Sequence, residues 1–232
     1  MSAPVTGSAS GSAGAPIRVL LVDDQELFRA GVSVIVDAQE GMEVVGQAAD
    51  GVEAVRLVEQ LTPDVVLMDI RMPEMDGVEA TRQIFAPERV ARRSRPVRVV
   101  VLTTFNLDDR AATAIRHGAS GFLLKDTTPR QLGDAIRTVH AGNAVLAPTD
   151  LSTLLDGQFR SATPPPTEYL GLTEKEREVF TAVALGLSNT EIAGQVFASE
   201  STVKTHVGAI LRKLALRDRV QIVVFAHRHG LV

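Results

Sequence analysis

Two spacings of apolar residues divide the first part of the chain. Short apolar runs without polar alternation are interleaved with stretches in which apolar residues recur every three or four positions. The first spacing is typical of strands buried on both faces of a parallel sheet, and the second of helices with one buried face. Strands are predicted at 17–22, 42–48, 64–68, 97–102 and 121–124, and helices at 26–37, 52–61, 77–85, 108–117 and 129–141. This alternation over residues 17–148 predicts an α/β domain, doubly wound around a five-stranded parallel sheet.

The pattern changes after residue 148. Residues 149–171 contain Ala162–Thr167, whose three consecutive prolines predict a stiff, extended linker. From residue 172 only helical spacing remains, and helices are predicted at 173–185, 189–196, 200–214 and 218–229, several of them beginning at a Ser or Thr cap. Residues 172–232 are therefore predicted to form a small all-α domain of helix-turn-helix type.

Composition narrows the class of protein. Apolar residues make up 45% of the 232 residues, which is typical of a globular chain. The absence of cysteine excludes disulfides, thiol catalysis and cysteine-based zinc sites. No apolar run approaches the roughly 18 residues of a membrane span. Residues 1–16 are rich in Ser, Ala and Gly without a positive charge, which predicts a disordered lead-in and not a signal peptide. We therefore expect a cytoplasmic protein without a membrane partner.

Charge is distributed unevenly along the chain. Residues 173–232 carry eight Lys or Arg and six Asp or Glu, whereas residues 1–172 carry 16 and 22. An acidic first part and a locally basic second part suggest metal-assisted anion handling in one and a polyanion surface in the other. The long loop predicted at 87–96 is also basic, and we expect its arginines to be solvated.

Carboxylates follow two of the predicted strands. Asp69 ends one buried run, and Asp23 and Asp24 end an earlier run of the same kind. The carboxyl ends of parallel strands meet at one edge of a sheet, where ligands gather in open α/β folds. Three carboxylates this close cannot all stay ionised without a cation, and Mg²⁺ suits carboxylates together with phosphate oxygens.

Two other polar residues end the remaining strands. Thr103 ends the fourth strand and Lys125 ends the fifth. A hydroxyl, an ammonium and a metal around one carboxylate suit phosphoryl transfer to Asp69. Each residue alone has an ordinary alternative, namely a helix cap for the aspartates, strand filler for Thr103 and a solvated surface group for Lys125. Their shared position at strand ends favours a single site.

These residues resemble a two-component receiver domain, a flavodoxin-like fold. The resemblance rests on Asp23-Asp24, Asp69-Ile70-Arg71-Met72-Pro73, Thr103 and Gly118-Ala119-Ser120-Gly121-Phe122-Leu123-Leu124-Lys125. It implies that a cognate histidine kinase phosphorylates Asp69, and that Asp24, Asp69 and the Arg71 carbonyl bind Mg²⁺ directly while Asp23 acts through water. It also implies that Thr103 and Lys125 contact the phosphate and that Phe122 is the aromatic switch residue.

The second part resembles the LuxR-type helix-turn-helix. The resemblance rests on Leu172–Val179, Gly186–Ala193, Ser201–Val207 and Leu211–Leu214. A receiver followed by this module is the arrangement of the NarL/FixJ class of response regulators. The resemblance implies binding to double-stranded promoter DNA and formation of a homodimer on phosphorylation, with part of the last helix in the dimer contact. In the unphosphorylated form, we expect the receiver to cover the recognition helix.

The helix predicted at 200–214 is the candidate recognition helix. Val203, Val207 and Ile210 belong to its inner stripe, and the N-terminal part of such a helix fits the major groove. By resemblance, Lys204, Thr205 and Gly208 face the bases. The remaining polar residues are assigned to phosphates or packing: Ser201, Thr202, His206, Arg212 and Lys213. The alternatives are a solvated helix face for the cations and a packing role for His206.

Two competing functions come from other classes. An α/β metal-dependent phosphohydrolase also uses an Asp nucleophile at a strand end, but it requires a second Asp two residues later, where this chain has Arg71. An interaction module that never takes phosphate is a further alternative, against which Asp69, Thr103 and Lys125 argue. The sequence favours a transcription regulator that is switched by phosphorylation and is not an enzyme.

Overall fold

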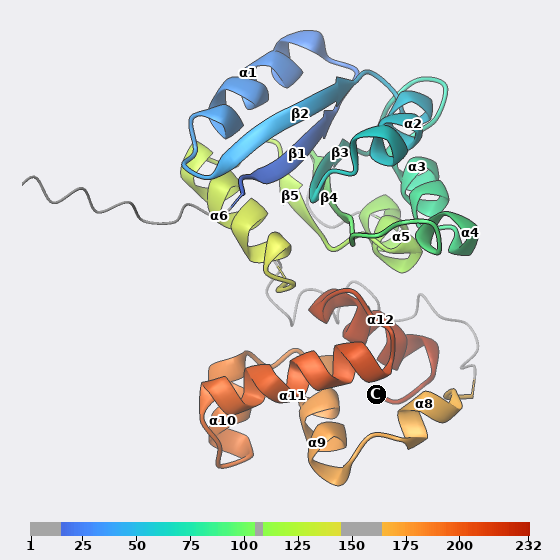
Figure 1. The fold of residues 1–232 in the computed structure, drawn as a ribbon, viewed down its shortest axis with the longest axis vertical. Helices are drawn as coiled ribbons and strands as arrows, with labels where there is room; N and C mark the ends of the chain where they lie inside the picture. The colour runs from blue at the N-terminus through green and yellow to red at the C-terminus, as the bar shows by residue number, and fades with distance from the viewer. Residues whose placement is uncertain (1–14, 105–108, 145–163) are drawn as a thin grey trace, which may run out of the picture.

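The first part of the protein is a parallel sheet with helices on both faces (Figure 1). The structure, a computed structural model, describes residues 15–104, 109–144 and 164–232. The strand order is β2-β1-β3-β4-β5, and every pairing is parallel. The strands are β1 (Ile17–Val22), β2 (Met42–Ala48), β3 (Val65–Asp69), β4 (Arg98–Thr103) and β5 (Gly121–Leu124). The predicted sheet is confirmed, with β3 and β4 each beginning and ending one residue later than expected.

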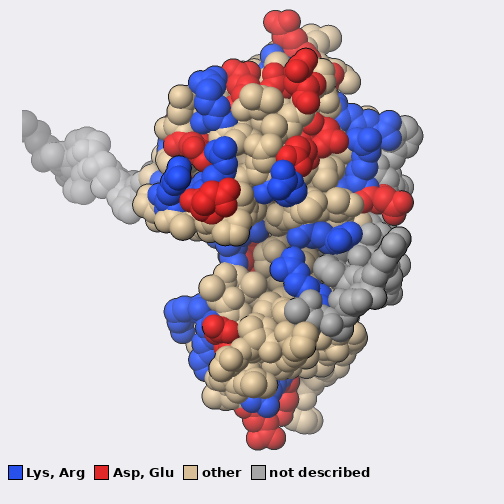
Figure 2. Space-filling model, turned by 90° about the vertical axis from the view of Figure 1, so that its right-hand side faces the viewer, with Lys and Arg blue, Asp and Glu red and all other residues tan. Residues whose placement is uncertain are grey.

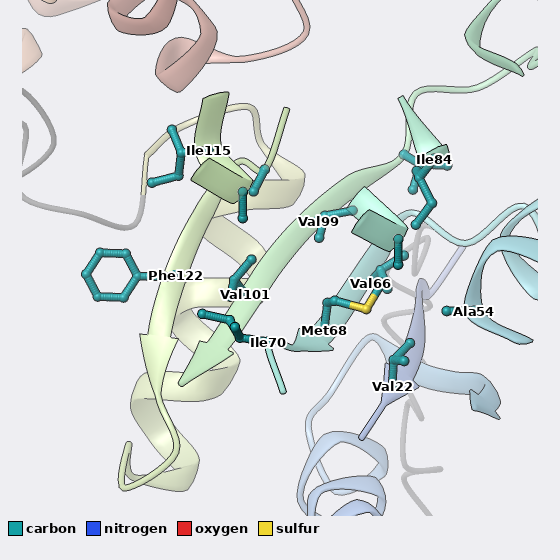
Figure 3. Close-up of a cluster of buried hydrophobic side chains, with 14 of the residues drawn as sticks. Val22, Ala54, Val66, Met68, Ile70, Ile84, Val99, Val101, Ile115 and Phe122 are labelled. Atoms are coloured by element: carbon teal, nitrogen blue, oxygen red, sulfur yellow. The ribbon is translucent and has the colours of Figure 1, made fainter. Parts of the chain in front are cut away.

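Six helices are described around this sheet: α1 (Glu26–Asp37), α2 (Gly51–Leu61), α3 (Gly77–Ile84), α4 (Pro87–Val90), α5 (Asp109–His117) and α6 (Pro129–His140). Side chains of α1 and α6 pack against one face of the sheet, and those of α2, α3 and α5 against the other. Figure 3 shows the second face, where Val101, Phe122 and Ile115 belong to one hydrophobic cluster. The one-turn helix α4 lies inside the segment predicted to be entirely loop, where Pro87 suits a first helical turn.

The second part consists of helices α8 (Thr167–Leu170), α9 (Glu174–Ala184), α10 (Asn189–Gln195), α11 (Glu200–Lys213) and α12 (Arg219–Arg228). Thr173 and Ser188 form capping boxes, and Ser199 caps the next helix, as their side-chain oxygens predict. Asp218, expected to be the first residue of the last helix, is its cap. Thr167 opens α8, so the end of the predicted linker is helical where the sequence suggested extended chain. Tyr169, Phe180 and Phe225 form an aromatic cluster in the core of this domain.

The two domains meet through α12 and the turn that precedes it. Val220, Val223 and Val224 of α12 belong to the same hydrophobic cluster as α5 and β5. The buried Ser120 hydroxyl, just before β5, donates a hydrogen bond to Asp218 Oδ2 at 2.7 Å. We call this contact the domain junction. It lies at the amino-terminal edge of β4 and β5, below the sheet in the view of Figure 1.

Across the described ranges, no helix has the length and apolar character that crossing a membrane requires.

Candidate functional site

The strand ends bring the predicted site residues together. Val22 is paired with Met68, so Asp23 and Asp69 leave adjacent strands side by side. Asp69 is paired with Leu102, and Thr103 with Leu124, which places Thr103 and Lys125 next along the same edge. The backbone N–H of Lys125 donates to the Thr103 carbonyl at 2.8 Å and fixes this arrangement. The edge predicted from the sequence is therefore formed, with Asp23, Asp69 and Thr103 all buried.

Lys125 is the cation that joins the carboxylates. Its ammonium lies 3.0 Å from Asp69 Oδ2 and 2.7 Å from Asp23 Oδ2. It also lies 4.7 Å from the centre of the Phe28 ring in α1, which stabilises the charge from a third side. Because only 10% of the Lys125 side chain is exposed, these attractions are weakly screened by water.

The pKa shifts follow from this arrangement. Burial raises the pKa of Asp69 above its ordinary value, although the hydrogen bond from Lys125 opposes the shift. Burial alone would lower the pKa of Lys125, but its hydrogen bonds to Asp23 and Asp69 raise it. The site therefore holds a cationic lysine beside a carboxyl group whose negative charge is not fully compensated.

The donor set fits a hard divalent cation. Carboxylate oxygens of Asp23, Asp24 and Asp69 all lie within 4.8 Å of one another. Asp23 Oδ2 is buried in its ion pair with Lys125, and Asp24 is exposed at the mouth of the site. Clustered carboxylate oxygens, one of them open to water, suit Mg²⁺, which retains several water ligands when it binds proteins. The backbone N–H of Arg71 donates to the Asp69 carboxylate and orients it.

Gly77 allows the loop after Asp69 to fold back on the strand. A Cβ at this position would lie 2.0 Å from the Asp69 carbonyl oxygen, which no side chain could accommodate. The Gly77 N–H donates to the Ile70 carbonyl at 3.0 Å, and Asp76 caps α3 through Glu79 N. This close approach fixes the backbone immediately after the candidate nucleophile.

Helix α11 presents an exposed polar face. Lys204, Thr205 and Gly208 are all exposed, and a Cβ at Gly208 would meet nothing within 4 Å. Val203 and Ile210 are buried against the rest of the helical domain, so the inner stripe is as predicted. Ser199 caps the helix from the turn after α10, leaving its N-terminal turn at the surface. The exposed N-terminal part of α11 could therefore enter the major groove of DNA.

Comparison with known families decides the identity. Residues 19–137 match the response regulator receiver domain, and residues 170–226 match the luxR family of bacterial regulatory proteins. The chain belongs to the LuxR-type response regulators. It is a transcription regulator with a receiver domain and a DNA-binding domain, and it is not an enzyme, so the phosphohydrolase alternative is wrong.

The chain aligns with curated relatives over nearly their whole length. The chain is 42% identical over 219 residues to the uncharacterized transcriptional regulatory protein YxjL of Bacillus subtilis, covering 93% of this chain and 97% of the relative. It is 40% identical over 216 residues to the transcriptional regulatory protein LiaR of the same organism, covering 93% and 99%. A solved LuxR-family two-component response regulator from Aurantimonas sp. is 33% identical, with a TM-score of 0.53, and covers 62% of this chain and 99% of that one.

Phe122 of the response regulator is packed inward. Its side chain is 8% exposed and lies in the cluster formed by β4, α5 and β5, near Ile115 and Val101 (Figure 3). Thr103, the last residue of the neighbouring strand β4, is also buried. The two residues that the resemblance assigns to the switch therefore lie on adjacent strands, on the path from Asp69 toward α5.

Three cations of the helical domain, of which Lys213 was assigned to DNA, have partners within the protein. Lys213 Nζ lies 2.7 Å from Glu176 Oε2 in α9, which ties it to the domain itself. Arg219 is buried, and its guanidinium donates to Asn189 Oδ1 at 2.8 Å and to the Leu187 carbonyl. Arg217 packs over the Phe85 ring of the receiver at 3.5 Å. The positive charge counted over residues 173–232 is thus only partly available to a polyanion.

The receiver covers α12 instead of the recognition helix. The polar face of α11 stays exposed, whereas Val220, Val223 and Val224 of α12 are buried against the receiver. The expectation that the receiver covers the recognition helix is therefore wrong for this arrangement. Part of the last helix was expected to form a dimer contact, and in this structure the receiver of the same chain packs on its valines.

The contacts of the domain junction were not predicted from the sequence. Arg217 donates to the carbonyls of Gly118 at 2.7 Å and Val97 at 3.4 Å, and Gln221 Nε2 donates to the Ala119 carbonyl at 3.3 Å. The one available signal was the polar pair Arg217-Asp218 directly before an apolar helix. Because that pair is also an ordinary helix cap, it pointed to local structure and not to a partner domain.

Proposed function

We propose that Asp69 accepts a phosphoryl group from a histidine kinase and that this modification switches DNA binding. In this transfer the P–N bond of the kinase phosphohistidine breaks and a P–O bond forms to an Asp69 carboxylate oxygen. Asp23, Asp24, Asp69 and the Arg71 carbonyl would hold Mg²⁺, which supplies positive charge to the phosphoryl oxygens. The observation that carries the proposal is the position of Lys125, whose ammonium touches the Asp69 carboxylate from a buried side.

Lys125 and Thr103 would act on the phosphoryl group once it is in place. The modification adds about −1.5 to −2 charges at neutral pH beside a single buried ammonium. Lys125 would then exchange the Asp23 and Asp69 carboxylates for a phosphoryl oxygen, and the Thr103 hydroxyl would donate to another. Phe122 would follow Thr103 into the space that it leaves.

Strand β5 supports coupling to the domain junction. Lys125 directly follows this strand of four residues, and Ser120, which binds Asp218, directly precedes it. Movement of the Lys125 end would therefore act on the Ser120 end at the other edge of the sheet. Release of α12 would free its valines for a second copy, and paired DNA-binding domains then bind two half-sites through effective concentration.

The first experiment is sedimentation velocity with Mg²⁺, with and without beryllofluoride, which mimics the acyl phosphate. Beryllofluoride is expected to convert the wild-type protein from monomer to dimer. Asp69→Asn preserves the shape of the side chain but removes the acceptor, so it should stay monomeric while retaining its circular dichroism spectrum. Phosphate from a labelled donor retained on Asp69→Asn would contradict the site assignment.

The DNA-binding residues are tested with a matched pair of lysines on α11. Lys204→Ala removes an exposed cation near the helix N-terminus and should weaken binding to a specific promoter site by about 1–3 kcal/mol. Lys213→Ala removes a lysine that is already held by Glu176, so a smaller loss is expected. Equal losses for Lys204→Ala on specific and unrelated DNA would instead assign Lys204 to phosphate contacts. The other proposed DNA contacts are Ser201, Thr202, Thr205, His206, Gly208 and Arg212.

A further inference from the structure

The basic segment between α3 and β4 contains one arginine that differs from its neighbours. Arg89 pairs with Glu59, Arg95 pairs with Asp64 at 3.0 Å, and Arg92 is exposed. Arg93 is half-buried, and within the described part of the chain its Nε and Nη2 atoms have no hydrogen-bond partner. The expectation of a solvated loop is therefore wrong for Arg93.

The two unpartnered atoms belong to one functional edge. Nε and Nη2 lie on the same side of the guanidinium and form the fork that binds a carboxylate or phosphate through two parallel hydrogen bonds. A buried charged donor that makes no hydrogen bond is costly, since it has lost its water without gaining a partner. This edge thus has a strong tendency to acquire an acceptor.

Arg93 borders a cavity of about 260 Å³ at the domain junction. Arg217 of the DNA-binding domain also lines this cavity, and the other lining residues belong to the receiver: Phe85, Val90, Ser94, Arg95, Pro96 and Val97. Arg217 is held in place, because its guanidinium stacks on Phe85 and donates to the Gly118 carbonyl. The cavity therefore joins a fixed cation of one domain to an unsatisfied cation of the other.

Arginines predominate among the charged residues that line the cavity, although Arg95 is paired with Asp64 and Asp218 adjoins Arg217. Burial lowers the pKa of Arg217 to about 10, opposed by Asp218 and assisted by the positive charges of Arg98 and Arg93. Burial also lowers the pKa of Arg93. Figure 2 shows basic side chains gathered where the two domains meet. An anion in the cavity would offset part of this positive charge.

We propose that this cavity is a binding site for a small phosphate-bearing anion that bridges Arg93 and Arg217. Two guanidinium groups and the Ser94 hydroxyl suit a tetrahedral anion with several acceptor oxygens. The cavity is smaller than the roughly 300–1,000 Å³ of sites for drug-sized ligands, so an anion of the size of orthophosphate or pyrophosphate fits better than a nucleotide. Because the two arginines belong to different domains, the anion would stabilise the closed junction, and opening of the junction would release it.

The test is titration of the full chain with inorganic phosphate, followed by calorimetry and by the melting temperature. Mg²⁺ is omitted and ionic strength is held constant, so that the Asp69 site and general screening contribute little. We expect Arg93→Gln to weaken phosphate binding about ten- to a hundredfold, since the fork is lost. Arg92→Gln removes the same charge from an exposed neighbour and should bind phosphate like the wild type. Arg93→Lys, which keeps the charge without the fork, should fall between them.

Two results would overturn the proposal. An equal rise of the melting temperature in the wild type and Arg93→Gln would mean that phosphate acts as a stabilising salt and not at this cavity. A loss of binding in Arg92→Gln as large as in Arg93→Gln would mean that only the net charge of the segment matters. Asp69→Asn should retain the anion site, so the outcome is separate from that of the phosphoacceptor proposal.

Discussion

The two edges of the receiver sheet are built in different ways. At the carboxyl edge, Asp23, Asp69 and Lys125 are brought together by strand register, and each residue follows a strand directly. At the amino-terminal edge, Ser120 contacts Asp218, which lies 98 positions later in the chain. One edge is a pocket of opposed charges that fits a metal ion, and the other is a contact between domains.

The two edges therefore differ in how much charge they hold and in how exposed that charge is. The carboxyl edge keeps its charges close to an opening, with Asp24 exposed and Lys125 almost covered. The domain junction buries its polar groups, including Ser120 and Asp218, among valines. A charge change at the first edge can therefore be large, whereas the second edge needs only a small displacement to lose its short hydrogen bonds.

The largest effect is expected at the carboxyl edge, from Lys125→Ala. Loss of the ammonium leaves Asp23 and Asp69 buried beside each other without a counter-ion. The free energy of unfolding should fall by about 3 kcal/mol at neutral pH in urea denaturation. Millimolar Mg²⁺ should restore part of this loss, because a cation can replace the missing charge. The control Lys175→Ala breaks an exposed pair with Glu178 and should cost less than about 1 kcal/mol. Unchanged stability of Lys125→Ala would mean that the lysine does not hold this edge together.

Gly77→Ala should have the next largest effect. The added Cβ would meet the Asp69 carbonyl oxygen and push the loop away from the strand, so we expect a loss of about 2 kcal/mol together with weaker Mg²⁺ binding. Gly31→Ala is the matched control, since nothing lies within 4 Å of a Cβ there. It should raise stability by about 0.5–1 kcal/mol, because alanine favours the helix. Urea midpoints for both variants measure the difference, and equal shifts would show that the loop yields easily.

The smallest effect on stability, but the largest on shape, is expected from Asp218→Ala. This change removes the cap of α12 and the acceptor for Ser120, and it should cost about 1–2 kcal/mol. The junction should also open, which lowers the sedimentation coefficient of the monomer. Asp218→Asn keeps a capping oxygen and should lie closer to the wild type. An unchanged sedimentation coefficient in Asp218→Ala would show that the valines of α12 alone hold the domains together.

The sequence predicted the carboxyl edge well because that edge is local. Asp69, Thr103 and Lys125 each stand at the end of an apolar run, and parallel strands necessarily align such ends. The caps of α9, α10 and α11 were predictable for the same reason, since each is encoded within three residues.

The domain junction could not be predicted in this way. Arg217 contributes to the positive charge counted over residues 173–232, while its stacking on Phe85 depends on how two domains pack. Arg93 is one of four arginines in a short segment, and only tertiary structure separates it from Arg92. The valines of α12 signalled a buried face without indicating which surface covers it.

The shared valine cluster has a consequence for how the protein unfolds. Val220, Val223 and Val224 complete a core whose other members belong to the receiver, while Ile222 and Ala226 of the same helix belong to the core of the DNA-binding domain. Melting of either domain removes part of the packing surface of the other. The closed chain should therefore unfold as one cooperative unit, whereas a chain with the junction open should show two separate transitions.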